Sequence, residues 1–222
     1  MVFGCRGGMM TYTQIAVGGE VAVVIGGTSG IGRAIAPGLA EAGADVIATS
    51  RRVEQVEATA REIEQRGRRT LRITSDVNVR SSLQKLLDAS VETFSKVDVL
   101  VNSAGRSKRA PTLDFPESDW NAIMETILMV AALTKTLAIE WARYGVCVNA
   151  IMPGVIRTAL NEQLLDGTPR GKEFLLRTPM QRFGKAEEIA GAAVFLASEA
   201  AGFVTGEILR VDGGMLASGV NQ

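Results

Sequence analysis

The sequence predicts an α/β protein in which a parallel, doubly wound sheet carries helices on both faces. Three observations lead to this prediction. Apolar segments of strand length alternate with helical segments from Glu20 onward, the first apolar run ends in a glycine-rich turn, and short polar or glycine motifs follow several later runs. With 222 residues, the chain has room for one domain with a sizeable core.

The individual elements follow from apolar periodicity and from punctuation by glycine. Strands are expected at 21–26, 45–49, 70–74, 97–101, 146–151 and 206–211. Helices are expected at 30–42, 53–66, 79–94, 118–143 and 186–198. Gly43 and Gly67 lie just past two of these helices, where left-handed C-caps occur. Pro37 falls inside the first helix, at a cost of about 3 kcal/mol unless the helix kinks.

The domain organisation is expected to be simple. Residues 1–19 contain several glycines and no convincing period, which predicts a weakly structured N-terminal extension, with Met9 or Met10 as the true start. Residues 20–222 are expected to form a single domain.

Composition excludes several classes of function. The 24 basic and 24 acidic residues balance, and no basic stripe of a nucleic-acid-binding protein stands out. The absence of histidine excludes a Ser-His-Asp triad and most zinc sites, so no metal site is expected. Two cysteines, no secretory signal and no bilayer-spanning apolar run favour a cytoplasmic protein without a membrane partner.

The glycine-rich turn is the strongest functional signal. Residues 26–32 read Gly-Gly-Thr-Ser-Gly-Ile-Gly and follow the apolar run 21–25, so backbone N–H groups and a helix N-terminus would face a phosphate. Alone, such a turn also occurs as a tight connection without a ligand. Further motifs follow the later strands: Asp76-Val77, Asn102-Ser103-Ala104-Gly105, Pro153-Gly154 and Asp212-Gly213-Gly214. Ligands of open α/β sheets lie at these carboxyl ends, which favours a bound dinucleotide.

In the order and spacing of these motifs, the chain resembles the classical short-chain dehydrogenases/reductases over residues 20–222, apart from one gap. The segments 140–146 and 216–219 are similar to the sugar and sugar-acid dehydrogenases of that family, while Ile25 stands where the family usually has threonine. The resemblance implies a Rossmann-like fold, a nicotinamide dinucleotide and the interconversion of an alcohol and a ketone, with a sugar or sugar acid as the small-molecule substrate. It also makes a homo-oligomer an open expectation.

The resemblance further implies which residues hold the cofactor. Gly26, Thr28, Ser29, Gly30, Ile31 and Gly32 would wrap the pyrophosphate, Asp76 and Val77 would contact the adenine, Asn102, Ala104 and Gly105 would flank the ribose, and Pro153, Gly154, Ile156 and Thr158 would hold the nicotinamide amide and phosphate.

Cofactor choice is read at the end of the second strand. An acidic residue there would bind the ribose 2′-hydroxyl, whereas arginine accommodates a 2′-phosphate. Ser50 occupies the expected acidic position and Arg51 follows it, which favours NADP(H) over NAD(H). The alternative is that Arg51 and Arg52 are solvated residues at the start of a helix.

The residues that perform the chemistry of the family are missing. The family uses a serine that polarises the oxygen, a tyrosine that moves the proton, and a lysine four residues later that lowers the tyrosine pKa. The two tyrosines, Tyr12 and Tyr144, are followed four residues later by Ala16 and Val148, so the sequence contains no Tyr-x-x-x-Lys. No catalytic residue is therefore assigned.

The gap can be located within one predicted helix. Residues 119–126 resemble the start of the family's fourth helix, Ile127 stands where an assisting asparagine is expected, and residues 130–135 resemble the middle of the fifth helix. About one βα unit, roughly 30 residues, is missing between them. The joined helix keeps one apolar face: Trp120, Ile123, Ile127, Val130, Thr134, Leu137 and Trp141.

Three consequences are expected from this join. Ser118 caps the joined helix and Gly145 ends it. The following strand slides in beside the fourth, giving a sheet of six strands. Substrate contacts would fall in the missing unit and in 159–182, where these side chains form either a lid or the core of two short helices: Leu160, Leu164, Leu165, Phe174, Leu175 and Met180.

Three functional interpretations stay open. The chain is an active NADP(H)-dependent oxidoreductase, a dinucleotide-binding module without turnover, or a defective or shortened product of an active dehydrogenase. Because no substitute for the catalytic acid is present, the first interpretation implies impaired catalysis for this chain.

Overall fold

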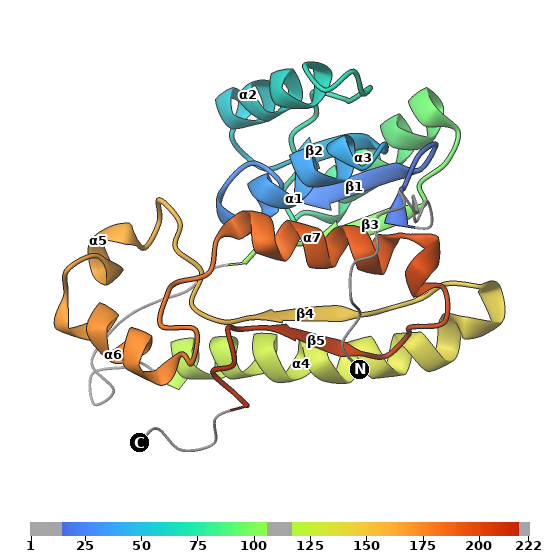
Figure 1. Ribbon diagram of the computed structural model, residues 1–222. Coiled ribbons are helices and arrows are strands. Elements are labelled where there is room, and N and C mark those ends of the chain that lie inside the picture. Colours follow the sequence, from blue (N-terminus) through green and yellow to red (C-terminus); the bar gives the residue numbers. More distant parts are fainter. Residues whose placement is uncertain (1–14, 106–116, 218–222) are drawn as a thin grey trace, which may run out of the picture.

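The structure of the protein, a computed structural model, describes residues 15–105 and 117–217, with only the backbone of 117–128 (Figure 1). Its strands are all parallel, as the sequence predicted. The strands are β1 (Val21–Ile25), β2 (Asp45–Thr49), β3 (Val99–Asn102), β4 (Ala150–Pro153) and β5 (Ile208–Val211). They form two sheets in the described residues, one with the order β2-β1-β3 and one that pairs β4 with β5.

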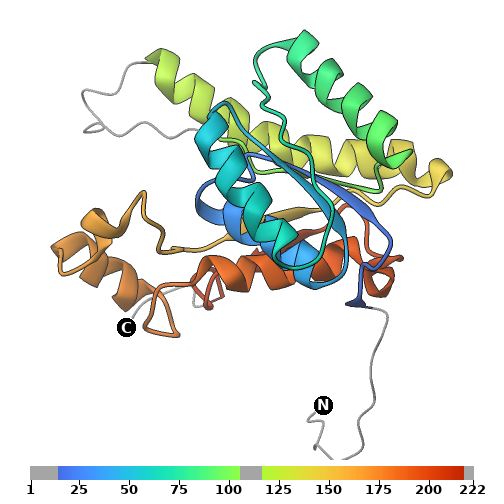
Figure 2. The same cartoon turned by 90° about the horizontal axis from the view of Figure 1, so that it is seen from above.

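Helices connect and cover these strands. The α-helices are α1 (Gly30–Glu41), α2 (Val53–Glu64), α3 (Arg80–Phe94), α4 (Glu117–Trp141), α5 (Glu162–Leu165), α6 (Pro169–Arg177) and α7 (Ala186–Ala197). Two short 3-10 helices are η3 (Ala142–Tyr144) and η4 (Glu199–Ala201). No helix in the described ranges is long and apolar enough to cross a membrane. Figure 2 shows α5 and α6 together at one side of the molecule.

The two sheets share one apolar core, which is organised by α1 and α7. Helix α7 packs along α1 and also contacts β4 and β5, and it runs between the two sheets in Figure 1. Val24 of β1, Leu39 of α1 and Ile189 of α7 are fully or almost fully buried in this cluster, and Ile151 and Val211 of the second sheet pack against it. The second sheet is therefore attached through a helix pair rather than through strand pairing.

The expectation of a strand at 70–74 is wrong. The segment is tied to β2 mainly near its two ends: Val46 N–H donates to the Arg69 carbonyl at 3.1 Å, and Ser75 N–H donates to the Ser50 carbonyl at 3.0 Å. Between these bonds, the Thr49 hydroxyl donates to the Ile73 carbonyl at 2.7 Å. A side chain thus replaces part of the backbone ladder, and five strands are described in place of the expected six.

The expectation that the strand after α4 slides in beside the fourth predicted strand is also wrong. Within the described residues, β3 pairs only with β1, and β4 pairs only with β5. Leu100 of β3 is 58% exposed, so no element of the described residues covers the face of β3 on which its side chain lies. Because α7 holds β4 and β5 by side-chain packing, the pair stays in place without closing the break.

Helix α4 is continuous across the proposed join, as the in-phase apolar positions predicted. It already includes Glu117, so Ser118 lies inside the helix and does not cap it. At the C-terminal end of α4, the 3-10 helix η3 follows directly, and Gly145 ends η3 as its C-cap with φ +73°. The predicted apolar face is buried only in part, since Thr134 is buried while Val130 is 51% exposed; the side chains at 120, 123 and 127 lie outside the described residues.

Other expectations about the chain meet mixed outcomes. Gly43 and Gly67 both adopt positive φ, at +112° and +73°, as predicted. Pro37 is buried within an uninterrupted α1. Residues 1–14 lie outside the described part, and the boundary at residue 20 stays a prediction, although Val17 is buried and its N–H donates to the Ala42 carbonyl at 3.0 Å.

The open side of β3 can be tested by truncating one side chain. Leu100→Ala is expected to lower the free energy of unfolding by less than about 1 kcal/mol, because the side chain is largely solvated. The matched control Leu39→Ala, at a fully buried position, is expected to cost about 2–5 kcal/mol. Urea titrations of both variants measure the two costs, and equal costs would show that β3 is covered in solution.

Candidate functional site

The glycine-rich turn packs against the loop that follows β3. Gly26 has φ +80°, and a Cβ placed on it would lie 2.7 Å from the backbone nitrogen of Ala104. A Cβ on Gly32 would collide with the Gly26 carbonyl and lie 3.0 Å from the Ser103 hydroxyl. Ser103 N–H donates to the Ile25 carbonyl at 2.9 Å, which fixes this loop beside the turn. Only glycine at 26 and 32 permits this approach, so the turn and the Asn-Ser-Ala-Gly motif form one unit.

The start of α1 is open toward this unit. Ser29 is the N-cap of α1, and its side chain makes no capping hydrogen bond. The first backbone N–H groups of the helix, beginning at Gly30, therefore have no side-chain acceptor from the cap, and such groups bind anions at a helix N-terminus. Ile31 packs against the shared core. Asn102, Ala104 and Gly105 are exposed at the end of β3, beside the same turn.

The ends of β2 and of the 70–74 segment meet at Ser50. We call the residues around it the adenosine corner, after the part of a dinucleotide that the sequence predicts there: Thr28, Ser50, Arg51, Gln55 and Asp76. The buried Thr28 hydroxyl donates to the Ser50 hydroxyl at 2.7 Å and to Gln55 Oε1 at 3.3 Å. Arg51 is exposed. The sequence-predicted residues of this corner are thus brought together, and the short 2.7 Å bond joins it to the glycine-rich turn.

Asp76 is held in its charged form at this corner. Its Oδ1 accepts the backbone N–H of Asn78 at 2.9 Å and the Asn78 side-chain amide at 2.9 Å. The backbone bond is the main cause that holds the pKa of Asp76 below its usual range, and the positive charge of Arg51 acts in the same direction. Val77 beside it is 49% exposed, which leaves an apolar surface open for a flat ring.

The motifs of the second sheet lie at the carboxyl ends of β4 and β5. Gly154 N–H donates to the Val211 carbonyl at 3.0 Å, and a Cβ on Gly154 would lie 2.6 Å from the Cα of Asp212. The backbone N–H groups of Leu216 and Gly214 donate to the Asp212 carboxylate at 2.9 Å each and hold its pKa below the usual range. Asp212 therefore orders the turn that follows β5.

The segment after β4 reaches the glycine-rich turn. Ile156 is buried in the shared core, and Thr158 N–H donates to Asn161 Oδ1 at 2.7 Å. Two residues beyond Thr158, Leu160 Cδ1 lies 3.8 Å from the position of a Cβ on Gly30. The break between the sheets thus does not separate the segment that contains Ile156 and Thr158 from the glycine-rich turn. Pro153 is exposed at the end of β4.

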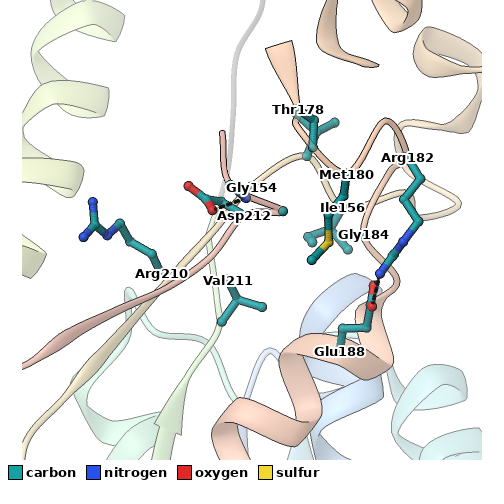
Figure 3. A pocket seen from close by; sticks show the side chains of 13 residues that line it. Gly154, Ile156, Thr178, Met180, Arg182, Gly184, Glu188, Arg210, Val211 and Asp212 are labelled. Carbon is teal, nitrogen blue, oxygen red and sulfur yellow. Dashed lines mark hydrogen bonds and ion pairs between the residues drawn. The ribbon is translucent and has the colours of Figure 1, made fainter. Parts of the chain in front are cut away.

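A cavity of about 320 Å³ lies between the ends of β4 and β5 and the segment 178–184 (Figure 3). Its wall includes Arg182, whose guanidinium pairs with both carboxylate oxygens of Glu188 at 2.6 and 2.8 Å. The Arg182 bonds, assisted by the Lys185 backbone N–H, lower the pKa of Glu188 to about 2. Arg210 is directed away from this pair.

The described residues offer no tyrosine at the carboxyl ends of the strands. Tyr144 lies in η3, before β4, and is 65% exposed; Tyr12 lies outside the described residues. The predicted lid residues divide, since Leu165 is buried and Leu160 and Met180 are 77% and 63% exposed. The core interpretation therefore holds for Leu165, and the lid interpretation of Leu160 and Met180 stays a prediction.

Sequence reasoning missed three contacts of the site: Ser103 beside Gly32, Leu160 beside Gly30, and Gln55 beside Thr28. A signal was available for Gln55, because it occupies the first turn of the helix that follows β2, the strand at whose end the sequence analysis reads cofactor choice. No local pattern marks the other two, since each depends on how distant segments pack.

Comparison with known proteins identifies what this arrangement is similar to. Residues 20–129 match the family described as short chain dehydrogenase, and residues 128–216 match the one described as Enoyl-(Acyl carrier protein) reductase. The 2-dehydro-3-deoxy-D-gluconate 5-dehydrogenase of Bacillus subtilis is 35% identical over 252 residues, with 92% of this chain and 98% of that protein covered.

Solved structures of dehydrogenases are also similar to this chain. A putative 2-deoxy-D-gluconate 3-dehydrogenase from Agrobacterium tumefaciens with bound NADP is 35% identical with a TM-score of 0.79, covering 92% of this chain and 99% of that one. A gluconate 5-dehydrogenase from Burkholderia cenocepacia in complex with NADP and tartrate is 30% identical with a TM-score of 0.81, covering 92% and 98%.

The close approach at Gly26 can be tested against a second glycine of similar φ. Gly67→Ala places a side chain at φ +73° in open space and is expected to cost about 1–2 kcal/mol of unfolding free energy. Gly26→Ala adds a collision with backbone of the 103–104 loop and is expected to cost more than Gly67→Ala. Thermal unfolding of both variants measures the two losses of stability. Equal losses for Gly26→Ala and Gly67→Ala would contradict the close packing of the turn on the 103–104 loop.

The Arg182–Glu188 pair predicts a pH dependence. Because the pKa of Glu188 is depressed in the folded state, to about 2 from 4.5, its stabilisation is complete above pH 4.5 and is lost as the pH falls toward 2. The difference in melting temperature between the unchanged protein and Glu188→Gln should therefore shrink over that window. Glu187→Gln is the control on the same helical turn, and a pH-independent difference for Glu188→Gln would contradict the assignment.

Proposed function

The chain belongs to the short-chain dehydrogenase family, and we propose that it is an NADP(H)-binding member whose turnover is strongly impaired. One observation carries this proposal. The glycine-rich turn, the adenosine corner and the segment through Ile156, Thr158 and Leu160 are assembled, whereas the sequence contains no Tyr-x-x-x-Lys.

The preference for NADP(H) is supported by the chemistry of the adenosine corner. The Thr28 hydroxyl donates to Ser50 and Gln55, and both of these side chains are neutral. Ser50 at the end of β2 would therefore not repel a 2′-phosphate. Arg51 is exposed and makes no ion pair within the described residues. Two similar structures carry NADP, which is consistent with this preference.

The reaction of the lineage is proposed to be the interconversion of a hydroxyl and a ketone on a sugar acid, because similar proteins are named for gluconate and 2-dehydro-3-deoxygluconate. Bound NADP(H) supplies or accepts the hydride. The residues of this chain would bind and orient the dinucleotide: the turn at Gly26–Gly32 would receive the pyrophosphate, and Gly154, Ile156 and Thr158 would hold the nicotinamide end.

Impairment is supported by the missing proton carrier and by the length of the relatives. The alignment with the Bacillus subtilis protein runs over 252 residues, which exceeds the 222 residues of this chain, so that protein carries residues without a counterpart here. The two family matches meet at 128–129, inside α4. This position agrees with the join inferred from the sequence.

The alternatives differ in origin rather than in chemistry. A dinucleotide-binding module without turnover and a shortened product of an active dehydrogenase would share this site. The intact mass of the native protein and a second reading of its gene distinguish them. A 222-residue product of an intact gene supports the binding module. A longer native product means that the present sequence is a shortened version of an active dehydrogenase.

Cofactor binding is tested by thermal stability. NADPH at 100 times its dissociation constant should stabilise the folded chain by about 2.7 kcal/mol, and NADH at the same concentration by less. Arg51→Ala should reduce the NADPH shift toward that of NADH, whereas Arg61→Ala, at the other end of α2, should not. The absence of any shift with either nucleotide would contradict the proposal.

Turnover is tested beside an active relative. With a keto sugar acid and NADPH, the chain should be about 10²–10⁴-fold slower than the Bacillus subtilis protein, since a general acid contributes that factor. Steady NADPH oxidation at a comparable rate would contradict the proposed impairment.

A further inference from the structure

Thr28 shares one hydroxyl hydrogen between two acceptors. Its hydroxyl lies 2.7 Å from the Ser50 hydroxyl oxygen and 3.3 Å from Gln55 Oε1. A hydroxyl carries a single hydrogen, so it cannot make both bonds at full strength. The longer bond orients the Gln55 amide without holding it tightly. Thr28 itself is 1% exposed, so this arrangement is fixed by the packing of the glycine-rich turn.

The other half of the Gln55 amide has donors to spare. No hydrogen bond of Gln55 Nε2 occurs among the described residues, although the side chain is half-buried. Gln55 is the third residue of α2, whose N-cap Arg52 makes no side-chain capping bond. A primary amide carries two N–H donors, and donors of this kind bind phosphate oxygens together with arginine.

Charges of both signs lie near Gln55, because Glu54 beside it in the first turn of α2 is acidic and exposed and two arginines precede the helix. Arg51 and Arg52 are exposed on the residues that lead into α2. The carboxylate of Glu57, two residues further on, is engaged by Arg72 at 3.0 Å. The Asp76 carboxylate is charged and is attracted by the Arg51 guanidinium, so it would compete with a phosphate for that guanidinium. A second donor at the end of β2 would therefore matter for holding a 2′-phosphate, and the contact with Thr28, which also bonds Ser50, places Gln55 at that end.

From this geometry we infer that Gln55 is a further determinant of cofactor preference, with its amide N–H groups donating to the 2′-phosphate while its carbonyl oxygen stays on Thr28. This inference rests on the proposed NADP(H) binding. Through Thr28, Gln55 also links the 2′-phosphate to the pyrophosphate turn, so the two ends of the adenosine half are recognised by one hydrogen-bonded set.

The decisive variant is Gln55→Glu. A carboxylate still accepts the Thr28 hydroxyl, so the support of the turn is retained, but both amide donors are lost and a negative charge faces the phosphate. The dissociation constant of NADPH should rise about tenfold or more, while that of NADH changes by no more than about twofold. Calorimetric titration of both nucleotides measures the ratio.

Two further variants sharpen the test. Gln55→Met removes donors and acceptor without adding charge, and it should weaken NADPH binding by a smaller factor than Gln55→Glu does. Gln65→Glu makes the same chemical change at the exposed far end of α2 and should leave both constants unchanged. Raising the salt concentration should narrow the effect of Gln55→Glu, because it is electrostatic.

The outcomes separate the possibilities. A selective loss of NADPH affinity in Gln55→Glu supports the inference. An equal loss of NADPH and NADH affinity overturns the inference, because Gln55 would then only support the glycine-rich turn. No loss of affinity for either nucleotide overturns it as well, because Gln55 would then not contribute to binding. If the unchanged protein binds neither nucleotide, the proposed function has failed, and this result is seen before any variant is compared.

Discussion

The packing of α7 on α1 is the contact on which the rest of the structure depends. The two helices meet through small side chains, and a Cβ on Gly38 of α1 would lie 3.0 Å from the Cβ of Ala190 on α7. Buried alanines on both helices let the helix axes approach closely. This contact joins two sheets that share no strand pairing in the described residues, because α7 also packs on β4 and β5.

That arrangement explains how the two halves of the proposed cofactor site stay together although the two sheets share no strand pairing in the described residues. The glycine-rich turn depends on β1, β3 and α1, and the segment through Ile156 and Thr158 depends on β4 and the shared core. Both are anchored to the same helix pair, so Leu160 still reaches Gly30. The sequence contains no Tyr-x-x-x-Lys, and for this reason we propose that the chain binds the cofactor but turns over poorly.

Local sequence was sufficient where local rules decide the structure. The strands β1 and β2, the glycine-rich turn and the terminator Gly145 were predictable, because apolar runs, backbone N–H groups and positive φ are properties of short segments. The continuity of α4 was predictable for the same reason, since its apolar positions stay in phase.

The remainder depends on contacts between distant segments. Periodicity placed Val130 on an apolar face, but it does not say whether another element covers that face, and Val130 is half exposed. The segment 70–74 has the composition of a strand but meets β2 mainly near its ends. The prediction that β4 lies beside β3 assumed that a strand would fill the place of the missing one. In the structure β4 pairs with β5 and is held by packing against α7. The role of Gln55 required knowing that Thr28 lies beside it.

Amide hydrogen exchange with and without NADPH tests most directly whether both halves form one cofactor site. The account predicts slower exchange in the presence of NADPH in the turn 26–32, in 50–55 and also in 154–160, across the break between the sheets. Slower exchange confined to the first sheet and its turns would contradict it, because the segment after β4 would then take no part in holding the cofactor.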